Sequence, residues 1–364
     1  MHSSLTPAIL KELRTQRPYP AVSLAMPTHR TRPENAQDPV RLDNLVREAA
    51  RQLDADPGVT KERRDDVVAQ LNEAVAETDL AHARDGLVVF AAPGEHRVWA
   101  VDRAVPERVV VADTFLTRNL VAADAAQKPY WVLAVAADRI ALWNGRGERV
   151  VEEEGHGFPL TRSLEDPDVE RKERIGDVPS TFRDEQARQF FREADAALAA
   201  VLAAESRRLY VTGEPAALSL LTESGSAAQG AVQVPFGGLA HGGGDAVAKA
   251  VAPARAADGE RVVTEALAAL DRARGSNTYA AGVDEVWQKA SDGRIHRLVV
   301  EDNYRVTVRA GEGHLEPAAD DDLDAVHDIV DEIVESALET GAEVVFVPDG
   351  QLADAGHVAA VLRF

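Results

Sequence analysis

The sequence of 364 residues contains no cysteine. This absence excludes disulfide bonds, thiolate metal sites and cysteine nucleophiles. Apolar runs are also short: none approaches the roughly 18 residues of a membrane span. The N-terminal segment MHSSLTPAILKELR lacks the apolar stretch of a signal peptide. We therefore expect a cytoplasmic, soluble protein that makes no membrane contact.

Lysine is scarce as well, with six residues beside 34 arginines, and the net charge is −21. An excess of negative charge disfavours non-specific nucleic-acid binding, which needs cations to release phosphate counterions. The charge is unevenly distributed, because residues 1–124, 125–255 and 256–364 carry −3, −4 and −14. This asymmetry predicts that the last third faces protein or water, and that any RNA contact belongs to the first two thirds.

Residues 1–124 show a pattern of mixed helices and strands. A buried strand is predicted at Ala21–Ala25, followed by a basic loop between Pro27 and Pro33. Asp38 is predicted as the N-cap of a helix with Pro39 at its first position. A second helix over Thr60–Thr78 and three strands within residues 86–112 complete an N-terminal α/β domain.

Residues 125–255 begin with the apolar run Pro129–Trp143, which is broken once at Ala137-Asp138 and therefore predicts a hairpin. The charged run Glu148–Glu154 predicts an edge strand. The polar segment Thr161–Asp184 predicts a solvated loop, after which apolar residues at three-to-four spacing predict a helix through Leu202. Strands at 209–212 and 231–235 follow, and then a long helical region with interruptions at Pro253 and Gly259.

Residues 256–364 alternate between predicted helices and strands. The helix Leu323–Leu338 carries apolar residues at core spacing, Asp320 to Asp322 are placed in its first turn, and Gly341 lies just beyond its end. The pattern predicts an α/β/α sandwich. The whole chain is thus expected to be of the α/β class with three domains, at residues 1–124, 125–255 and 256–364.

Two motifs have enzymatic interpretations that the sequence does not support well. His241-Gly242-Gly243-Gly244 resembles the oxyanion turn of esterases, but the chain has no G-x-S-x-G motif, and Lys249 is not part of a phosphate-binding loop. Asp138 with Glu152, Glu153 and Glu154 could hold the metal of a nuclease. Charged turns and edge strands are the ordinary alternative, so no catalytic residue, cofactor or metal ligand is assigned.

Two basic clusters are the candidate RNA-binding sites, because arginine suits both phosphate and unpaired bases. Both clusters fall in predicted loops, where exposed charge is also the ordinary condition. The candidate residues are His29, Arg30, Arg32, Arg171, Lys172, Arg174 and Arg183.

Four stretches, at Val22–Leu53, Gly86–Leu120, Pro129–Gly145 and 281–304, together with the closing AAVLRF, resemble the bacterial branch of the archaeo-eukaryotic peptide-chain release factor family. The resemblance covers nearly the whole chain in collinear order. It implies an N-terminal α/β domain, an RNase H-like middle domain and a C-terminal domain with the kink-turn-binding ribosomal protein fold.

Release factors of this superfamily carry Gly-Gly-Gln in a loop of the middle domain, and that glutamine supports peptidyl-tRNA hydrolysis. The corresponding stretch Leu164–Arg188 has no such motif. The resemblance therefore implies a non-catalytic, ribosome-associated factor related to Pelota-like rescue and bacterial hibernation factors, bound at the A site in hibernation, rescue or stress.

The expected partners are rRNA or tRNA for the first two domains and a translational GTPase or ribosomal protein for the acidic third domain. Two alternatives stay open: a hydrolase that uses the middle domain around Asp138, and a protein-interaction module without a ribosomal role.

Overall fold

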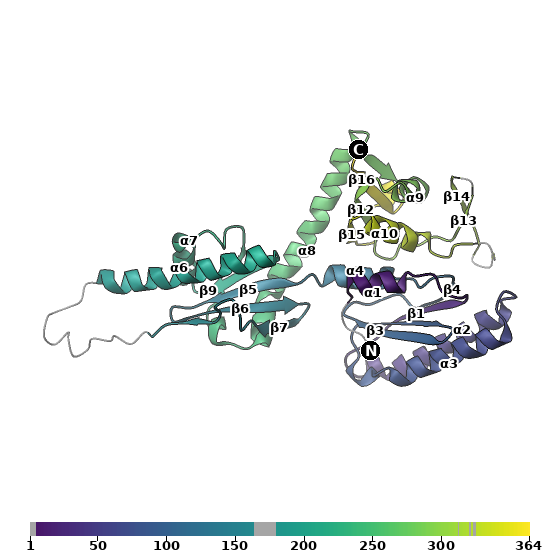
Figure 1. Ribbon diagram of the computed structural model, residues 1–364, viewed down its shortest axis with the longest axis horizontal. Helices are drawn as coiled ribbons and strands as arrows, with labels where there is room; N and C mark the ends of the chain where they lie inside the picture. The colour runs from purple at the N-terminus through teal and green to yellow at the C-terminus, as the bar shows by residue number, and fades with distance from the viewer. Residues whose placement is uncertain (1–4, 164–179, 312, 320–321, 323–324) are drawn as a thin grey trace. The chain divides into compact units, whose positions relative to one another are not determined.

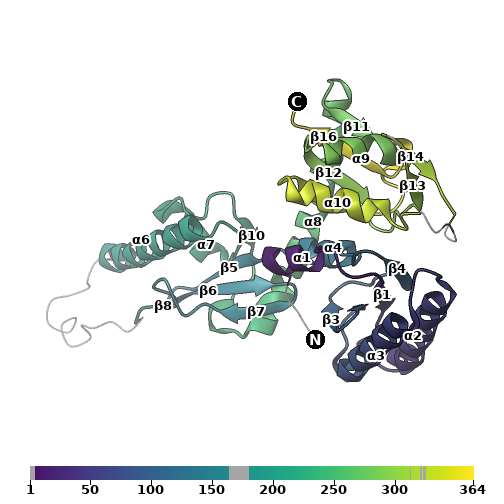
Figure 2. The same ribbon diagram turned by 45° about the vertical axis from the view of Figure 1, so that its right-hand side comes forward.

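The structure, a computed structural model, describes residues 5–163, 180–311, 313–319, 322 and 325–364. The chain forms two compact units (Figures 1 and 2). Unit 1 joins the two ends of the chain, residues 1–126 and 261–364, and unit 2 is Gln127–Glu260. Each unit is mixed α/β, so the predicted fold class is confirmed, whereas the three domain boundaries stay a prediction.

The first part of unit 1 is a four-stranded antiparallel sheet in the order β3-β2-β1-β4. Figure 1 shows α2 and α3 along one face of this sheet and α1 and α4 along the other. The elements are α1 (Pro7–Leu13), β1 (Ala21–Pro27), η1 (Glu34–Gln37), α2 (Asp38–Ala55), α3 (Lys61–Glu77), η2 (Leu80–His82), β2 (Gly86–Ala92), β3 (Glu95–Val101), β4 (Arg108–Ala112) and α4 (Arg118–Ala126).

The alternation of side chains along β1 explains the two layers. Val22 and Leu24 belong to the core beneath α2 and α3. Ala21 and Ala25 belong to the core on the opposite face, with Phe115 and Leu120. Because both faces of the sheet are covered, β1 is almost completely buried, although the loop that follows it is basic.

The predicted cap of α2 is wrong. Asp38 is the first helical residue, Pro39 follows it inside the first turn, and the N-cap is Gln37, which makes no side-chain capping bond. The reason is tertiary: the Asp38 carboxylate, 1% exposed, is bonded to the preceding loop instead.

The second part of unit 1 is a sheet in the order β11-β16-β12-β15, in which β12 and β15 are parallel and the other pairs antiparallel. One core contains α9 and α10, and a second core on the other face contains the end of α8, as the α/β/α prediction requires. The elements are β11 (Tyr279–Ala281), α9 (Val283–Ser291), β12 (Ile295–Glu301), β13 (Val308–Ala310), β14 (Leu315–Pro317), α10 (Ile329–Glu339), β15 (Glu343–Val347), η4 (Ala353–Ala355) and β16 (Val358–Leu362).

Helix α10 begins at Ile329, later than predicted. Val326 forms a β-bridge with Val308 and cannot be helical at the same time. Asp322 consequently lies outside the helix, whose first turn contains Asp331 and Glu332. Asp320 and Asp321 lie outside the described residues.

Unit 2 has a sheet in the order β10-β9-β5-β6-β7, with β8 paired to β6. Strands β5, β6 and β7 form an antiparallel meander, while β9 and β10 run parallel to β5. The elements are β5 (Tyr130–Val135), β6 (Arg139–Arg146), β7 (Arg149–Glu152), β8 (Leu160–Thr161), α6 (Ser180–Ala204), β9 (Arg208–Gly213), α7 (Pro215–Ser224), β10 (Val232–Val234), η3 (Leu239–His241) and α8 (Gly244–Arg274), which continues into unit 1.

The hairpin break at Ala137-Asp138 and the charged edge strand are confirmed. Helices α6 and α7 share one core with the sheet, and η3 and the first part of α8 share the core on its other face. The predicted interruptions of the long helix are wrong, because α8 contains both Pro253 and Gly259. Packing of Val247 and Val251 before the proline, both fully buried, offsets the hydrogen bond that proline cannot donate.

Gly244 at the start of α8 shows why the glycine-rich turn has its composition. A Cβ atom there would lie 2.1 Å from the carbonyl oxygen of Val150. The turn therefore brings the helix against the backbone of the edge strand β7, which only glycine permits.

Within the described residues, no helix combines the length and apolar character needed to cross a membrane.

Candidate nucleic-acid interface

The first predicted basic cluster lies in the loop that follows the central strand β1. Thr28, 5% exposed, fixes the start of this loop: its amide donates to the Asp85 carbonyl oxygen at 3.0 Å and its hydroxyl to the Arg84 carbonyl oxygen at 3.0 Å. The loop is thus attached to the segment before β2. Its root is fixed even though its tip is exposed.

Asp38 fixes the next part of the loop. Its carboxylate accepts hydrogen bonds from the amide of His29 at 2.8 Å, from His29 Nδ1 at 2.9 Å and from the Arg41 guanidinium at 2.9 Å. A buried carboxylate is costly unless it is paired, and these three donors supply the pairing. His29 is therefore a positioned residue whose imidazole is about one-third exposed.

Arg30 is already engaged by acidic side chains. Its Nε donates to one carboxylate oxygen of Asp85 at 2.8 Å, and a terminal guanidinium nitrogen donates to the other at 2.8 Å. The same terminal nitrogen also lies 3.3 Å from Asp102 Oδ1. The side chains of Arg30 and Asp85 are about 40% exposed. Exposed pairs contribute only about 0–1 kcal/mol, so a phosphate could replace the carboxylates at small cost.

Arg32 is the least engaged of the three candidates in this loop. It is exposed, and no ion pair involves it within the ranges that the structure covers. Around the loop, four arginines and four carboxylates balance each other. They are Arg30, Arg32, Arg41 and Arg84, against Asp38, Asp85, Asp102 and Glu107. The surface around the loop is therefore nearly neutral, and most of its guanidinium groups are held in place by ion pairs.

The second predicted cluster falls outside the described part of the chain. Arg171, Lys172 and Arg174 lie within residues 164–179, and the side chain of Arg183, in the first turn of α6, is not described either. His29, Arg30 and Arg32 lie in the one loop that follows β1, and the contribution of the other four residues stays a prediction.

The alternative site around Asp138 takes an unexpected form. Asp138, between β5 and β6, pairs with His241 Nε2 at 3.1 Å, so the two motifs noted separately in the sequence meet. The hydrogen bond from His241 lowers the pKa of Asp138. Both side chains are exposed, at 37% and 55%, which makes this an open surface pair.

The metal-dependent interpretation of this region gains no support. Glu152 is bonded to Arg139. Among the described residues, no group of three or more histidine, aspartate or glutamate side chains could hold a metal ion. Sequence reasoning could not pair Asp138 with His241, because 103 positions separate them and no periodic pattern in the sequence contains both.

Comparison with known proteins gives one match at the level of sequence families. Residues 129–294 match the sequence profile of bacterial archaeo-eukaryotic release factor family 3. No curated protein matches the chain.

Similar solved structures include an archaeal translation termination factor, aRF1, with 20% identity over 98% of this chain and 96% of that one and a TM-score of 0.24. A model of ribosome-bound archaeal Pelota and ABCE1 has 19% identity over 76% of this chain and 78% of that one, with a TM-score of 0.39. The S. cerevisiae protein Dom34 is described as a translation termination-like factor that interacts with Hbs1. It has 11% identity over 74% of this chain and 74% of that one, with a TM-score of 0.37. Similarity this slight transfers no residue role and no partner.

Proposed function

We propose that this chain, which is a bacterial archaeo-eukaryotic release factor-like protein, is a ribosome-associated factor that occupies the A site without hydrolysing peptidyl-tRNA. The match of residues 129–294 to a release factor family carries the ribosomal half of the proposal. The lack of a Gly-Gly-Gln motif anywhere in the 364 residues carries the non-catalytic half.

The glutamines nearest the expected position support the second half. Gln186 and Gln189 both lie within α6, exposed and without a preceding glycine, and the Gln189 amide donates to Glu193 at 3.0 Å. A glutamine held in a helix cannot offer the close backbone approach that paired glycines permit. We assign no catalytic residue and no cofactor.

The domain assignments belong to the same proposal. The meander β5-β6-β7 followed by two strands parallel to β5 supports an RNase H-like middle domain. The layered sheet of residues 279–362 supports the kink-turn-binding ribosomal protein fold. We place the boundaries at residues 1–124, 125–255 and 256–364.

In this role the exposed arginines contact RNA and the acidic third domain contacts protein. Arg30 and Arg32 are held on a fixed loop root and meet rRNA or tRNA phosphates, and we assign Arg171, Lys172, Arg174 and Arg183 to the same contact. The −14 charge of residues 256–364 directs that domain to a translational GTPase or a ribosomal protein.

Two measurements test the proposal. Purified ribosomes, empty or carrying an A-site tRNA, are sedimented through sucrose with the protein; we expect co-sedimentation with the empty A site and displacement by the tRNA. Release of labelled peptide from programmed ribosomes is measured in parallel and should not exceed the rate in buffer. The ribosomal role fails if the protein stays at the top of the gradient, and the non-catalytic role fails if peptide is released.

A further inference from the structure

Buried carboxylates at the start of α10 face the first part of the chain inside unit 1. Asp331, 3% exposed, accepts hydrogen bonds from the amides of Thr117 at 3.2 Å and Arg118 at 2.5 Å, one at each carboxylate oxygen. These amides lie at the start of α4, where helical N–H groups have no partner of their own. Both oxygens of Asp331 are therefore used, and they join the two end segments of the chain.

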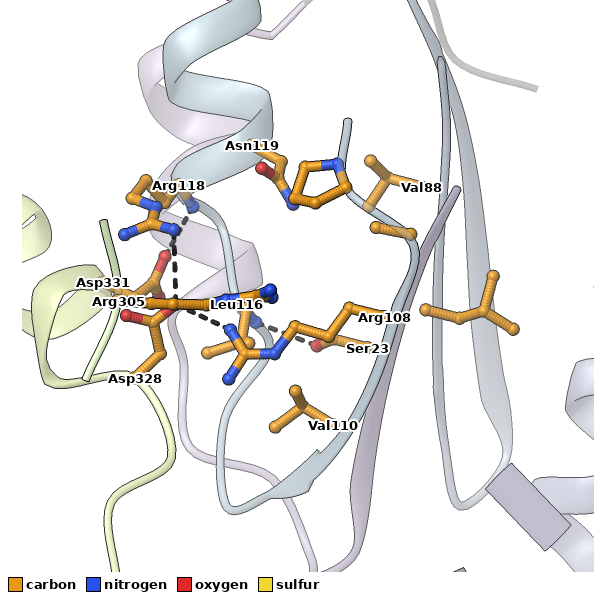
Figure 3. A pocket seen from close by; sticks show the side chains of 13 residues that line it. Ser23, Val88, Arg108, Val110, Leu116, Arg118, Asn119, Arg305, Asp328 and Asp331 are labelled. Atoms are coloured by element: carbon orange, nitrogen blue, oxygen red, sulfur yellow. Dashed lines mark hydrogen bonds and ion pairs between the residues drawn. The ribbon is translucent and has the colours of Figure 1, made fainter. Parts of the chain in front are cut away.

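The neighbouring Asp328, at the N-cap of α10, is only half used (Figure 3). Its Oδ2 atom lies 2.9 Å from a terminal nitrogen of Arg108 and 3.5 Å from one of Arg118. Its Oδ1 atom is buried and has no hydrogen-bond partner among the described residues. The side chain is only 3% exposed. A buried acceptor without a donor is costly, so Oδ1 requires a donor from elsewhere.

The two arginines nearest to Asp328 are already bound to other acceptors. Arg108 donates to Asp328 Oδ2 through one terminal nitrogen and to the His327 carbonyl oxygen at 2.9 Å through the other. Arg118 donates to the Tyr304 carbonyl oxygen. If one of these bonded nitrogens turned toward Oδ1, its present bond would be lost. A separate donor molecule satisfies Oδ1 without that loss.

Asp328 lines a cavity of about 20 Å³ whose other walls include residues of β1, β2 and β4 (Figure 3). A water molecule needs about 10–15 Å³ of such space and two to four polar partners. The cavity thus has room for one water molecule and not for a larger ligand. Its polar walls include the side chains of Ser23, Arg108, Arg118, Asn119, Arg305 and Asp328.

The charges around the cavity favour a neutral ligand. Three guanidinium groups, those of Arg108, Arg118 and Arg305, line it together with the carboxylates of Asp328 and Asp331. A cation would be repelled by the guanidinium groups and an anion by the carboxylates, and such repulsion is strong at short distances away from bulk water. A neutral molecule that can both donate and accept hydrogen bonds avoids both costs.

We propose that this cavity is the binding site of one water molecule, which donates a hydrogen bond to Asp328 Oδ1 and accepts one from the N–H groups that line the cavity. Asp328 belongs to the last part of the chain, whereas Arg108, Arg118 and Asn119 belong to the first part. The water therefore bridges the two end segments of the chain, beside the direct bonds of Asp331.

A crystal structure of the full-length protein, at a resolution that shows ordered water, tests the site directly. We expect a water molecule about 2.5–3.0 Å from Asp328 Oδ1, the ordinary O–H···O distance. The proposal is overturned if no water lies within hydrogen-bonding distance of Oδ1. It is also overturned if a side chain, such as that of Arg305 or Asn119, fills the cavity and donates to Oδ1 instead.

The variant Val110→Ile tests the site in solution, because it adds one methylene group at the cavity wall and should displace the water. Val110 lines the cavity, and Val111, the next residue of β4, packs into the core on the opposite face of the sheet. Val111→Ile is therefore the matched control. Oxygen-17 relaxation dispersion, which detects long-lived bound water, should show one water molecule fewer in Val110→Ile than in wild type or in the control.

Chemical denaturation measures what the bridge contributes. Displacing the water leaves Asp328 Oδ1 without a partner, so Val110→Ile should lower the folded-to-unfolded ratio about 5- to 100-fold. If the cavity were dry, the added methylene would leave this ratio unchanged or raise it by up to about fourfold. Val111→Ile measures the cost of the same added volume on the same strand.

A Val110→Ile variant at least as stable as wild type, with the same number of long-lived water molecules, would contradict the bridge. So would a loss of stability no larger than that of Val111→Ile. If circular dichroism shows that Val110→Ile is unfolded, the crystal structure of the wild-type protein still decides the question.

Discussion

Replacing Arg32 should change RNA binding more clearly than replacing Arg30, although both lie on the same loop. Each lost phosphate contact lowers the slope of log affinity against log salt by about 0.7 to 0.9. Arg32 has no carboxylate partner among the described residues, so Arg32→Ala should show this full decrease. Arg30 must first leave Asp85 and Asp102. The freed carboxylates then bind salt cations, which offsets part of the cations that the phosphate releases. Arg30→Ala should therefore lower the salt slope by less than Arg32→Ala does.

The same reasoning predicts a gain of affinity. The double variant Asp85→Asn, Asp102→Asn removes the ion pairs of Arg30 with Asp85 and Asp102, each contributing about 0.2–1 kcal/mol. Arg30 would then bind phosphate without that loss, so affinity should rise about 2- to 30-fold at fixed salt, since about 1.4 kcal/mol corresponds to a factor of ten. Glu107→Gln is the control, because it removes a nearby charge that pairs with Arg41 instead.

The assay is ribosome binding followed by sedimentation or fluorescence anisotropy at five or more salt concentrations. Unchanged slopes in both arginine variants would remove the loop from the interface. A double variant that gains no more affinity than Glu107→Gln would show that the carboxylates do not restrain Arg30.

Three further outcomes are expected. Asp38→Ala should lower the free energy of unfolding by about 1–3 kcal/mol in chemical denaturation, because the partly buried donors of His29 and Arg41 lose their buried acceptor; a change within error would show that the loop is fixed by other contacts. Phe191→Ala, at a fully buried site of unit 2, should cost about 3–5 kcal/mol and, in calorimetry, shift only the transition of that unit. A fragment of residues 256–364 should fold alone by circular dichroism and should not bind rRNA at physiological salt, and an unfolded or rRNA-binding fragment would contradict its assignment as an acidic, independent domain.

Much of the fold could be predicted because burial imposes a period on the sequence. The hairpin of Pro129–Trp143 was found from its apolar run, and the layers over the last sheet were found from the core spacing of α10. The continuous helix α8 could not be predicted in this way. Its Pro253 is tolerated only because residues distant in sequence pack around the turns before and after it.

The candidate sites divide along the same line. The sequence by itself determined which cations could meet RNA and that no Gly-Gly-Gln is present, since both are matters of residue type and order. The tertiary structure decided what those residues do at rest: it paired Arg30 with two aspartates and left Arg32 exposed.

The environment of Asp331, which lies 3% exposed on α10, depended entirely on tertiary structure. In the sequence, Asp331 is one more acidic residue on an amphipathic helix, where solvent would be its usual environment. Only the packing of α10 against α4 buries it and gives it two amide donors. Electrostatic energies depend on burial and on distances between groups far apart in the chain, and a linear pattern records neither.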